Sequence, residues 1–200
     1  MSTKPMLIRS LLRAAVVAAA AIASASCGDV VRSSRSPAML VVDSLGTGGT
    51  ATTLSSDVVD TTTAPCTVAS PCVSGDTIEA TLGVVMKDVT VSPTTNNQVT
   101  VSRYHVSYRR SDGRNTPGVD VPFGFDGAVT TTIPANSNGS LEFQIVRLTA
   151  KLEQPLVQLR QTSTVISAIA DVTFFGADQV GNEVSVTGSV LINFGNFSDK

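Results

Sequence analysis

Apolar and polar residues alternate in short runs along much of the chain after residue 77, and this period of two restricts the fold more than any other feature. In the run 78–86, one face carries only apolar side chains, namely Ile78, Ala80, Leu82, Val84 and Met86. Successive side chains of a strand point to opposite faces of a sheet, so the alternation predicts strands with one buried face. The predicted strands are 38–43, 78–86, 99–110, 119–125, 128–133, 141–145, 166–174 and 184–194.

Clusters of turn-forming residues separate these runs. They lie at 92–98, 111–115, 126–127, 136–140 and 178–182, and a change of alternation at Lys87–Asp88 predicts a bulge. The segment 151–162 is expected to form a short helix or a crossover connection. The chain has no Trp and few charged residues, a composition that favours strands. We therefore expect an all-β fold, a single antiparallel β-sandwich of about seven to eight strands.

The first 27 residues form a separate segment. Lys4, Arg9 and Arg13 make a positive start without acids, an alanine-rich apolar run continues to Ala23, and small residues lead to Cys27. This pattern is typical of a secretory signal peptide. The apolar run is shorter than the roughly 20 residues that a membrane-spanning helix needs.

Ser24-Ala25-Ser26-Cys27 resembles the lipobox of bacterial lipoproteins, although Ser24 stands where an aliphatic residue is usual. The resemblance implies cleavage before Cys27 and acylation of that cysteine, with ordinary cleavage near Ala25 as the alternative. It divides the chain into a lipoprotein signal peptide (1–26), a polar tether (27–37) and a β-sandwich domain (38–200) with a Ser/Thr/Gly-rich loop region at 45–76. The expected location is the bacterial cell envelope, with the protein lipid-anchored in the outer rather than the inner membrane. The alternative is a secreted or periplasmic protein.

Two stretches of the domain resemble immunoglobulin-like families. Residues 104–113 are similar to the third strand and turn of fibronectin type III domains. The hairpin at 178–182 is similar to the last strand pair of bacterial immunoglobulin-like and cadherin-like modules. Together they cover under a third of the chain. The resemblance implies a bacterial lipoprotein with an immunoglobulin-like sandwich, without the buried Trp of fibronectin type III domains.

Cys66 and Cys72 form a closely spaced pair that an oxidising compartment would join. A disulfide is the first interpretation, and two free thiols are the alternative. The pair is too close in sequence to connect two sheets in the immunoglobulin manner, and two cysteines alone make a poor metal site.

The residues with chemical potential do not form a catalytic pattern. His105 is the only histidine, it alternates with Tyr104 and Val106, and no nucleophile motif accompanies it. Asp112, Asp120, Asp126 and Asp178 could contribute to a calcium site, but their positions suit turns better. No catalytic residue, metal site or cofactor is predicted.

Removal of residues 1–26 takes away three of the 14 basic residues and none of the 16 acidic ones, which leaves a net charge of −5. This balance argues against a nucleic-acid partner. The expected function is that of a non-enzymatic, lipid-anchored cell-envelope protein, structural or protein-binding, whose partners are the membrane and an envelope protein or glycan. A secreted or anchored glycan-binding accessory module is the alternative, although exposed aromatic residues are expected to be few.

Overall fold

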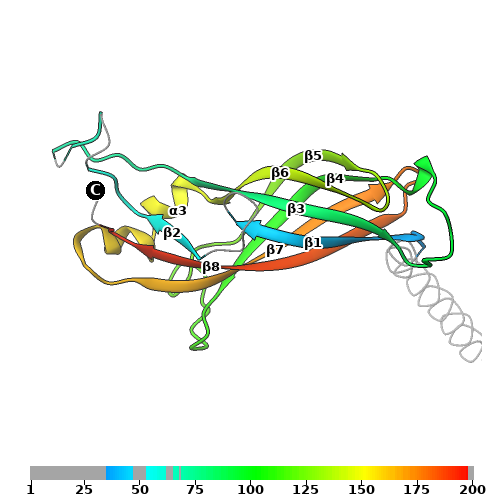
Figure 1. Cartoon of the computed structure of the whole chain (residues 1–200). Helices are drawn as coiled ribbons and strands as arrows, with labels where there is room; N and C mark the ends of the chain where they lie inside the picture. Colours follow the sequence, from blue (N-terminus) through cyan, green and yellow to red (C-terminus); the bar gives the residue numbers. More distant parts are fainter. Residues whose placement is uncertain (1–34, 47–52, 62–64, 68, 198–200) are drawn as a thin grey trace, which may run out of the picture.

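The protein is all-β, and its strands form two sheets packed against each other (Figure 1). The computed structural model describes residues 35–46, 53–61, 65–67 and 69–197. Cys27, the signal segment and most of the predicted tether lie outside the described residues.

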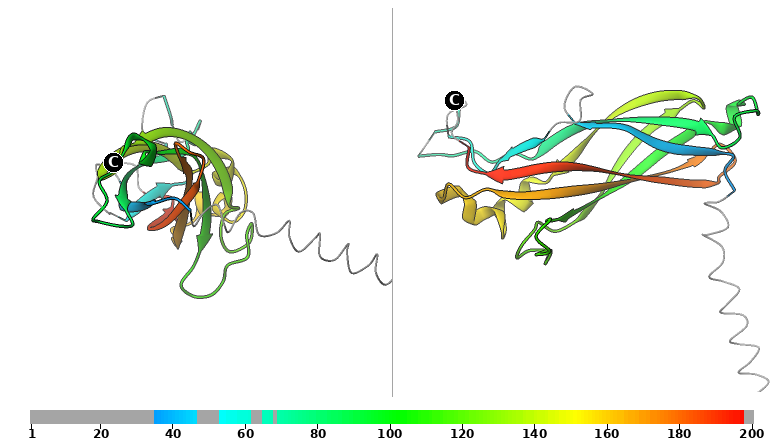
Figure 2. Two further views of the ribbon diagram at one scale, coloured as in Figure 1. Left: turned by 90° about the vertical axis from the view of Figure 1, so that its right-hand side faces the viewer. Right: turned by 60° about the horizontal axis from the view of Figure 1, so that its bottom comes forward.

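One sheet has three strands and the other has five. The first contains β1 (Ala38–Gly46), β3 (Asp76–Met86) and β6 (Ser137–Val146) in the order β1-β3-β6. The second has the order β2-β8-β7-β4-β5, with the bounds β2 (Leu54–Asp57), β8 (Glu183–Gly195), β7 (Ile166–Asp178), β4 (Val99–Arg109) and β5 (Phe125–Ile133). The five-stranded sheet curls around the smaller one (Figure 2).

The core lies between the inner faces of the two sheets. The alternating residues predicted to be buried in 78–86 are all buried, as are Tyr104, Val106 and Tyr108 of β4. Phe143 of β6 packs edge-on against Tyr104 at 5.0 Å and against Phe174 at 5.2 Å between ring centroids. These rings belong to opposite sheets, so their contacts hold the sheets together.

The predicted strand 119–125 is wrong. This segment is a loop, and the side chains of Val119 and Phe123 are more than half exposed. The predicted turn at Asp126–Gly127 is wrong as well, because β5 begins at Phe125 and continues through both residues. Gly127 faces the ring of Tyr104, which a Cβ at this position would meet at 2.2 Å. The glycine therefore serves close packing within a strand rather than a turn.

Three smaller expectations also differ. The bulge expected at Lys87–Asp88 is absent, since β3 ends at Met86 and a turn follows, whereas the register of β4 shifts between Val101 and Arg103. The predicted turn at 136–140 is shorter, because β6 begins at Ser137. The sandwich is not purely antiparallel, because the edge strand β2 pairs in parallel with β8. This edge strand lies within the segment 45–76 that was expected to form a loop region.

The segment expected as a helix or crossover is helical. It begins with the last two residues of α3 (Leu148–Leu152) and contains the 3-10 helix η2 (Leu156–Gln161). A second 3-10 turn, η1 (Thr95–Asn97), lies in the connection between β3 and β4. The hairpin turn at 178–182 is present as predicted, with a hydrogen bond from Asp178 N–H to Asn182 O at 3.0 Å.

The elongated molecule has two distinct ends (Figures 1 and 2). The N-terminal end contains residues 35–38, the loop 87–98 and the turn 179–182. Register places them together, because Ala38 lies opposite Met86 and Val99 lies opposite Asp178. The helical end contains β2, α3, η2 and the disulfide segment 65–72. It lies away from the start of β1.

Candidate functional site at the helical end

A buried ion pair stands at the centre of the helical end. The side chain of Lys151, on α3, is 1% exposed. Its Nζ donates hydrogen bonds to Asp76 Oδ1 at 2.9 Å and to the carbonyl oxygen of Asp57 at 2.7 Å. The Ser56 hydroxyl donates to the other oxygen of the Asp76 carboxylate at 2.5 Å. One amine and one carboxylate therefore connect α3, β2 and the start of β3.

Tyr108 and Arg160 extend this polar cluster. The Tyr108 hydroxyl donates to the carbonyl oxygen of Ile145 at 2.6 Å. Burial, and secondarily the nearby charge of Asp76, raises the pKa of Tyr108, so the phenol stays protonated at neutral pH. Arg160 Nη2 donates to the carbonyl oxygen of Lys151 at 3.0 Å. The Nε of Arg160 is buried and has no hydrogen-bond partner among the described residues.

The surroundings of Lys151 favour a structural role over a catalytic one. Its amine is sealed from solvent and occupied by two oxygen atoms of the protein. A reacting amine has to reach a substrate, and this one is held inside the sandwich. The pair therefore fixes the helical connection onto the end of the sheets.

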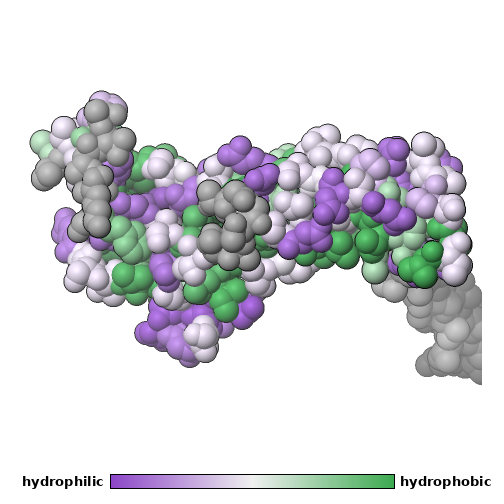
Figure 3. Space-filling model, in the orientation of Figure 1, coloured by the Kyte–Doolittle hydropathy of each residue, from purple (hydrophilic) through white to green (hydrophobic). Residues whose placement is uncertain are grey.

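A groove of about 480 Å³ opens beside this cluster, between the loop 110–124 and η2. Arg110 and Arg114 line it from the loop, and both bind the carboxylate of Asp112, at 2.7 and 2.9 Å. Hydrogen bonds from the two arginines lower the pKa of Asp112 to about 2. The opposite wall consists of Gln158, Leu159, Thr162, Thr164, Val165 and Ile166. Figure 3 shows that the loop projects from the molecule with a mainly hydrophilic surface.

A second hollow, of about 320 Å³, lies between the same loop and α3. Phe123 lines it on one side, with Arg147 and Glu153 among the other lining residues. The guanidinium of Arg147 stacks over the Phe125 ring at 4.1 Å, and its Nη2 donates to the carbonyl oxygen of Asp126. Five large apolar side chains are exposed in the loop 110–124, in α3 and in the connection 162–165 before β7: Val119, Phe123, Leu148, Leu152 and Val165. The helical end thus combines apolar side chains with arginines.

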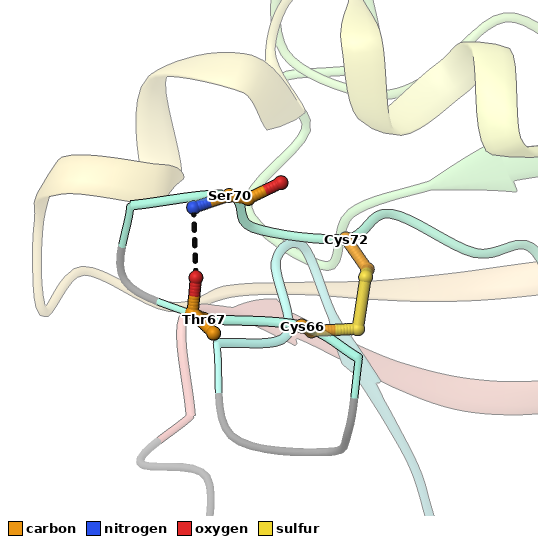
Figure 4. Close-up of a disulfide and its surroundings, with 4 residues drawn as sticks. All are labelled: Cys66, Thr67, Ser70 and Cys72. Carbon is orange, nitrogen blue, oxygen red and sulfur yellow. Dashed lines mark hydrogen bonds between the residues drawn. A yellow bond between two sulfur atoms is a disulfide. The ribbon is translucent and has the colours of Figure 1, made fainter.

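Cys66 and Cys72 are joined by a disulfide, as predicted, with a Cα–Cα distance of 5.4 Å (Figure 4). Within the loop that they close, the Ser70 N–H donates to the Thr67 hydroxyl at 3.0 Å. A backbone bridge between Asp60 and Cys72 ties the loop to the residues after β2. The disulfide therefore shapes a surface loop at the helical end and does not connect the sheets.

His105 lies on the outer face of the five-stranded sheet, where its Nδ1 is 3.1 Å from Asp126 Oδ1. The carboxylate of Asp178 binds its own hairpin turn, and that of Asp120 accepts the Thr116 N–H. Among the described residues, no group of three or more His, Cys, Asp or Glu side chains could hold a metal ion. The candidate acids thus stand apart from one another.

The buried pair was not predicted from the sequence. Lys151 lies between Ala150 and Leu152 in a segment with weak helical periodicity, and Asp76 follows a glycine in a turn-like context. The two are 75 residues apart. A lysine inside an apolar helical segment is the only local signal, and it is more often a surface residue.

The comparisons with protein-family models, curated proteins and solved structures found no match to this chain. In the part of the chain that the structure describes, no helix is long and apolar enough to cross a membrane.

Proposed function

We propose that this protein is a non-enzymatic, lipid-anchored protein of the bacterial cell envelope that presents its helical end to a protein partner. The observation that carries the proposal is the separation of the two ends. The described chain enters at the N-terminal end, where Ser36 is buried and hydrogen-bonds Asp178, while both grooves lie on the side of the helical connection. An anchor at Cys27 would thus attach the domain to the membrane by the end opposite the grooves.

The proposed anchor rests on the residues before the domain. The positive start, the short apolar run and Ser24-Ala25-Ser26-Cys27 favour lipid modification of Cys27. Only eight residues separate Cys27 from Ser36, so the domain would stay close to the lipid surface. Two or more acyl chains are needed for stable attachment, and a lipoprotein cysteine carries that number.

We further propose that the sandwich is immunoglobulin-like. In the immunoglobulin order, the first, second, fourth and fifth strands form one sheet, and the third, sixth and seventh form the other. With β1, β3 and β6 as the first, second and fifth strands and β4, β7 and β8 as the third, sixth and seventh, the observed order agrees with this arrangement, except that β5 lies beside β4 and not in the first sheet. Domains of this architecture commonly serve as binding or spacer modules, and the fold alone assigns no partner.

The helical end supports a protein partner better than the other surfaces do. Interfaces are enriched in aromatic residues and arginine at their centre. Phe123, Leu148 and Leu152 are exposed on the loop and α3, and Arg110 and Arg114 flank the larger groove. A glycan partner is the second candidate, because Phe123 is an exposed aromatic ring at the edge of a hollow, where a sugar could stack.

The intact mass of the protein extracted from its native membranes tests the anchor. We expect the mass of the chain from Cys27 plus acyl groups, and loss of membrane association in the variant Cys27→Ala. A chain that begins at Ser26 and carries no lipid contradicts the proposal. Cys66→Ala together with Cys72→Ala is the matched control and should leave membrane association unchanged.

Site-specific crosslinking tests the partner surface. A photoreactive residue at Leu152 or Phe123 is expected to crosslink one defined envelope protein, whereas the same residue at Thr132, on the outer face of β5, is not. Binding of the purified protein to a glycan array tests the second candidate, a glycan partner. Binding to one glycan class that Phe123→Ala abolishes would replace the protein partner with a glycan.

A further inference from the structure

Three valine side chains are exposed at the N-terminal end. Val89 is 92% exposed, Val91 is 50% exposed and Val180 is 64% exposed. Val89 and Val91 come from the loop 87–98, and Val180 is at the tip of the β7–β8 hairpin. We call these three residues the valine tip. Exposed valines at the tips of two loops cost solvation energy unless another apolar phase covers them.

Hydrogen bonds hold the two loops together and to the start of the domain. The Gln179 N–H donates to the Asn96 carbonyl oxygen at 3.2 Å, which joins the hairpin to the loop. The Lys87 N–H donates to the Pro37 carbonyl oxygen at 2.9 Å, which joins the loop to the residues before β1. The position of the valine tip is therefore set relative to the point where the chain enters the domain. Figures 1 and 2 show both loops beside the start of β1.

The distance along the chain places this end near a lipid surface if Cys27 is anchored. Nine peptide links from Cys27 to Ser36 reach at most about 30 Å when fully extended. Ser36 is buried and hydrogen-bonds Asp178, next to the hairpin tip. The valine tip and the residues that lead back to Cys27 thus lie at the same end of the described structure.

The net charge around the valine tip is small. The charged residues in or next to these loops are Arg35, Lys87, Asp88, Asp178 and Glu183, two basic and three acidic. The carboxylate of Asp88 is already bound by the Thr90 hydroxyl at 2.7 Å. Neither strong repulsion from anionic lipids nor strong attraction to them is expected, so apolar contact decides the interaction.

We propose that the valine tip inserts into the interfacial region of the membrane that holds the lipid anchor. This inference rests on the proposed anchoring at Cys27. The contact fixes the sandwich upright on the lipid surface with its helical end directed outward. A single point of attachment would leave the orientation free, whereas tips from two loops together with the anchor define it.

Tryptophan substitutions test the contact, because the chain has no Trp of its own. We expect Val89→Trp and Val180→Trp, in the anchored full-length protein reconstituted in neutral phosphatidylcholine vesicles, to show blue-shifted emission that lipids with brominated chains quench. Val119→Trp is the matched control, since Val119 is 65% exposed in the loop 110–124. Its emission should stay that of a residue in water. Blue shift and quenching should both persist in high salt.

Equal emission from all three variants on vesicles overturns the valine tip as a membrane contact. A second variant gives an independent measurement: Val180→Asp added to Val89→Trp should reduce the quenching. Unchanged quenching in that variant also counts against the proposal. The intact mass of the same samples shows whether Cys27 carries a lipid. Failure of the proposed anchor can therefore be distinguished from failure of the proposed membrane contact. If Cys27 carries no lipid in cells, a maleimide lipid attached to its thiol supplies the anchor, and the fluorescence result still decides the contact.

Discussion

At the scale of the residue, Lys151 is a polar side chain whose loss is expected to destabilise the fold strongly. Burial of a charge is unfavourable unless a partner compensates it, and here one carboxylate and one carbonyl oxygen do so. Loss of either partner leaves the other charge inside the protein. An ion pair of the same two charges on the protein surface would contribute little to the free energy of unfolding.

We expect Lys151→Met to lower the free energy of unfolding by about 3 to 5 kcal/mol, because Asp76 loses its cation. Urea denaturation measures this change in the free energy of unfolding. Arg109→Met is the matched control: it removes the solvent-exposed pair with Asp171 and should lower the free energy of unfolding far less than Lys151→Met does. Asp76→Asn added to Lys151→Met should restore part of the loss. Equal effects of Lys151→Met and Arg109→Met would contradict a special role of the buried pair.

The lowered pKa of Asp178, at the N-terminal end, predicts that the free energy of unfolding depends on pH. Burial alone would raise the pKa of this carboxyl, but hydrogen bonds from Asn182, Ser36 and Val180 outweigh it and lower the pKa below its usual 3.8. The stabilisation is therefore complete above pH 3.8 and is lost as the pH falls through the lower folded-state pKa. We expect the difference in unfolding free energy between the protein and Asp178→Asn to shrink below about pH 4.

Denaturant titrations at a series of pH values measure this difference. Ser36→Ala removes one of the donors, so the folded-state pKa of Asp178 should lie closer to the unfolded value, and the pH-dependent loss of stability should be smaller and end at a higher pH than in the unchanged protein. Stability curves of the protein and Asp178→Asn that stay parallel down to pH 2 would be inconsistent with the lowered pKa.

At the scale of the element, the disulfide loop and β2 form a small unit at the helical end. β2 has only four residues and pairs with β8 alone, so it depends on Ser56 and on the Asp57 carbonyl for its attachment to Asp76 and Lys151. The disulfide holds the segment that follows through the bridge between Asp60 and Cys72.

We expect Cys66→Ser with Cys72→Ser to lower the free energy of unfolding by about 2 kcal/mol, because a loop of this length restricts the unfolded chain only modestly. Thermal unfolding measures the change, and reduction of the unsubstituted protein should reproduce it. Since the loop lies outside the core, the sandwich should still unfold in one cooperative transition. A complete loss of the folded state would mean that the disulfide supports the sheets, contrary to its position.

At the scale of the whole molecule, the two longest strands define the length. β7 and β8 have 13 residues each and run together from the hairpin at the N-terminal end toward the helical end. At roughly 3.3 Å per residue they span about 40 Å. An upright domain therefore holds its grooves on the order of 40 Å from the lipid surface.

Neutron reflectometry on a supported bilayer that carries the anchored protein measures this height. We expect a protein layer at least about 40 Å thick, in keeping with the strand length. A domain lying flat would give about 25 Å, the width of five strands at their usual spacing. The thinner layer would contradict the upright orientation.

The sequence by itself determined the faces of most strands, the hairpin at 178–182 and the disulfide partners. The period of two reports which side of a strand avoids water, and it did so for β3, β4, β6 and β7. It failed at 119–124, where the apolar residues lie in a loop that exposes Val119 and Phe123, and at Gly127, where the signal of a turn belongs to a packing contact with Tyr104. Both errors arise because local pattern carries no information about which segments meet.

Only the tertiary structure decided the sheet membership of each strand, the parallel pairing of β2 and the union of Lys151 with Asp76. It also brought Val89, Val91 and Val180 to one end, from loops about 90 residues apart in the chain. These features depend on the closure of the two sheets over a shared core. Closure brings together groups that are distant in sequence and then determines which charges and apolar side chains lose their contact with water.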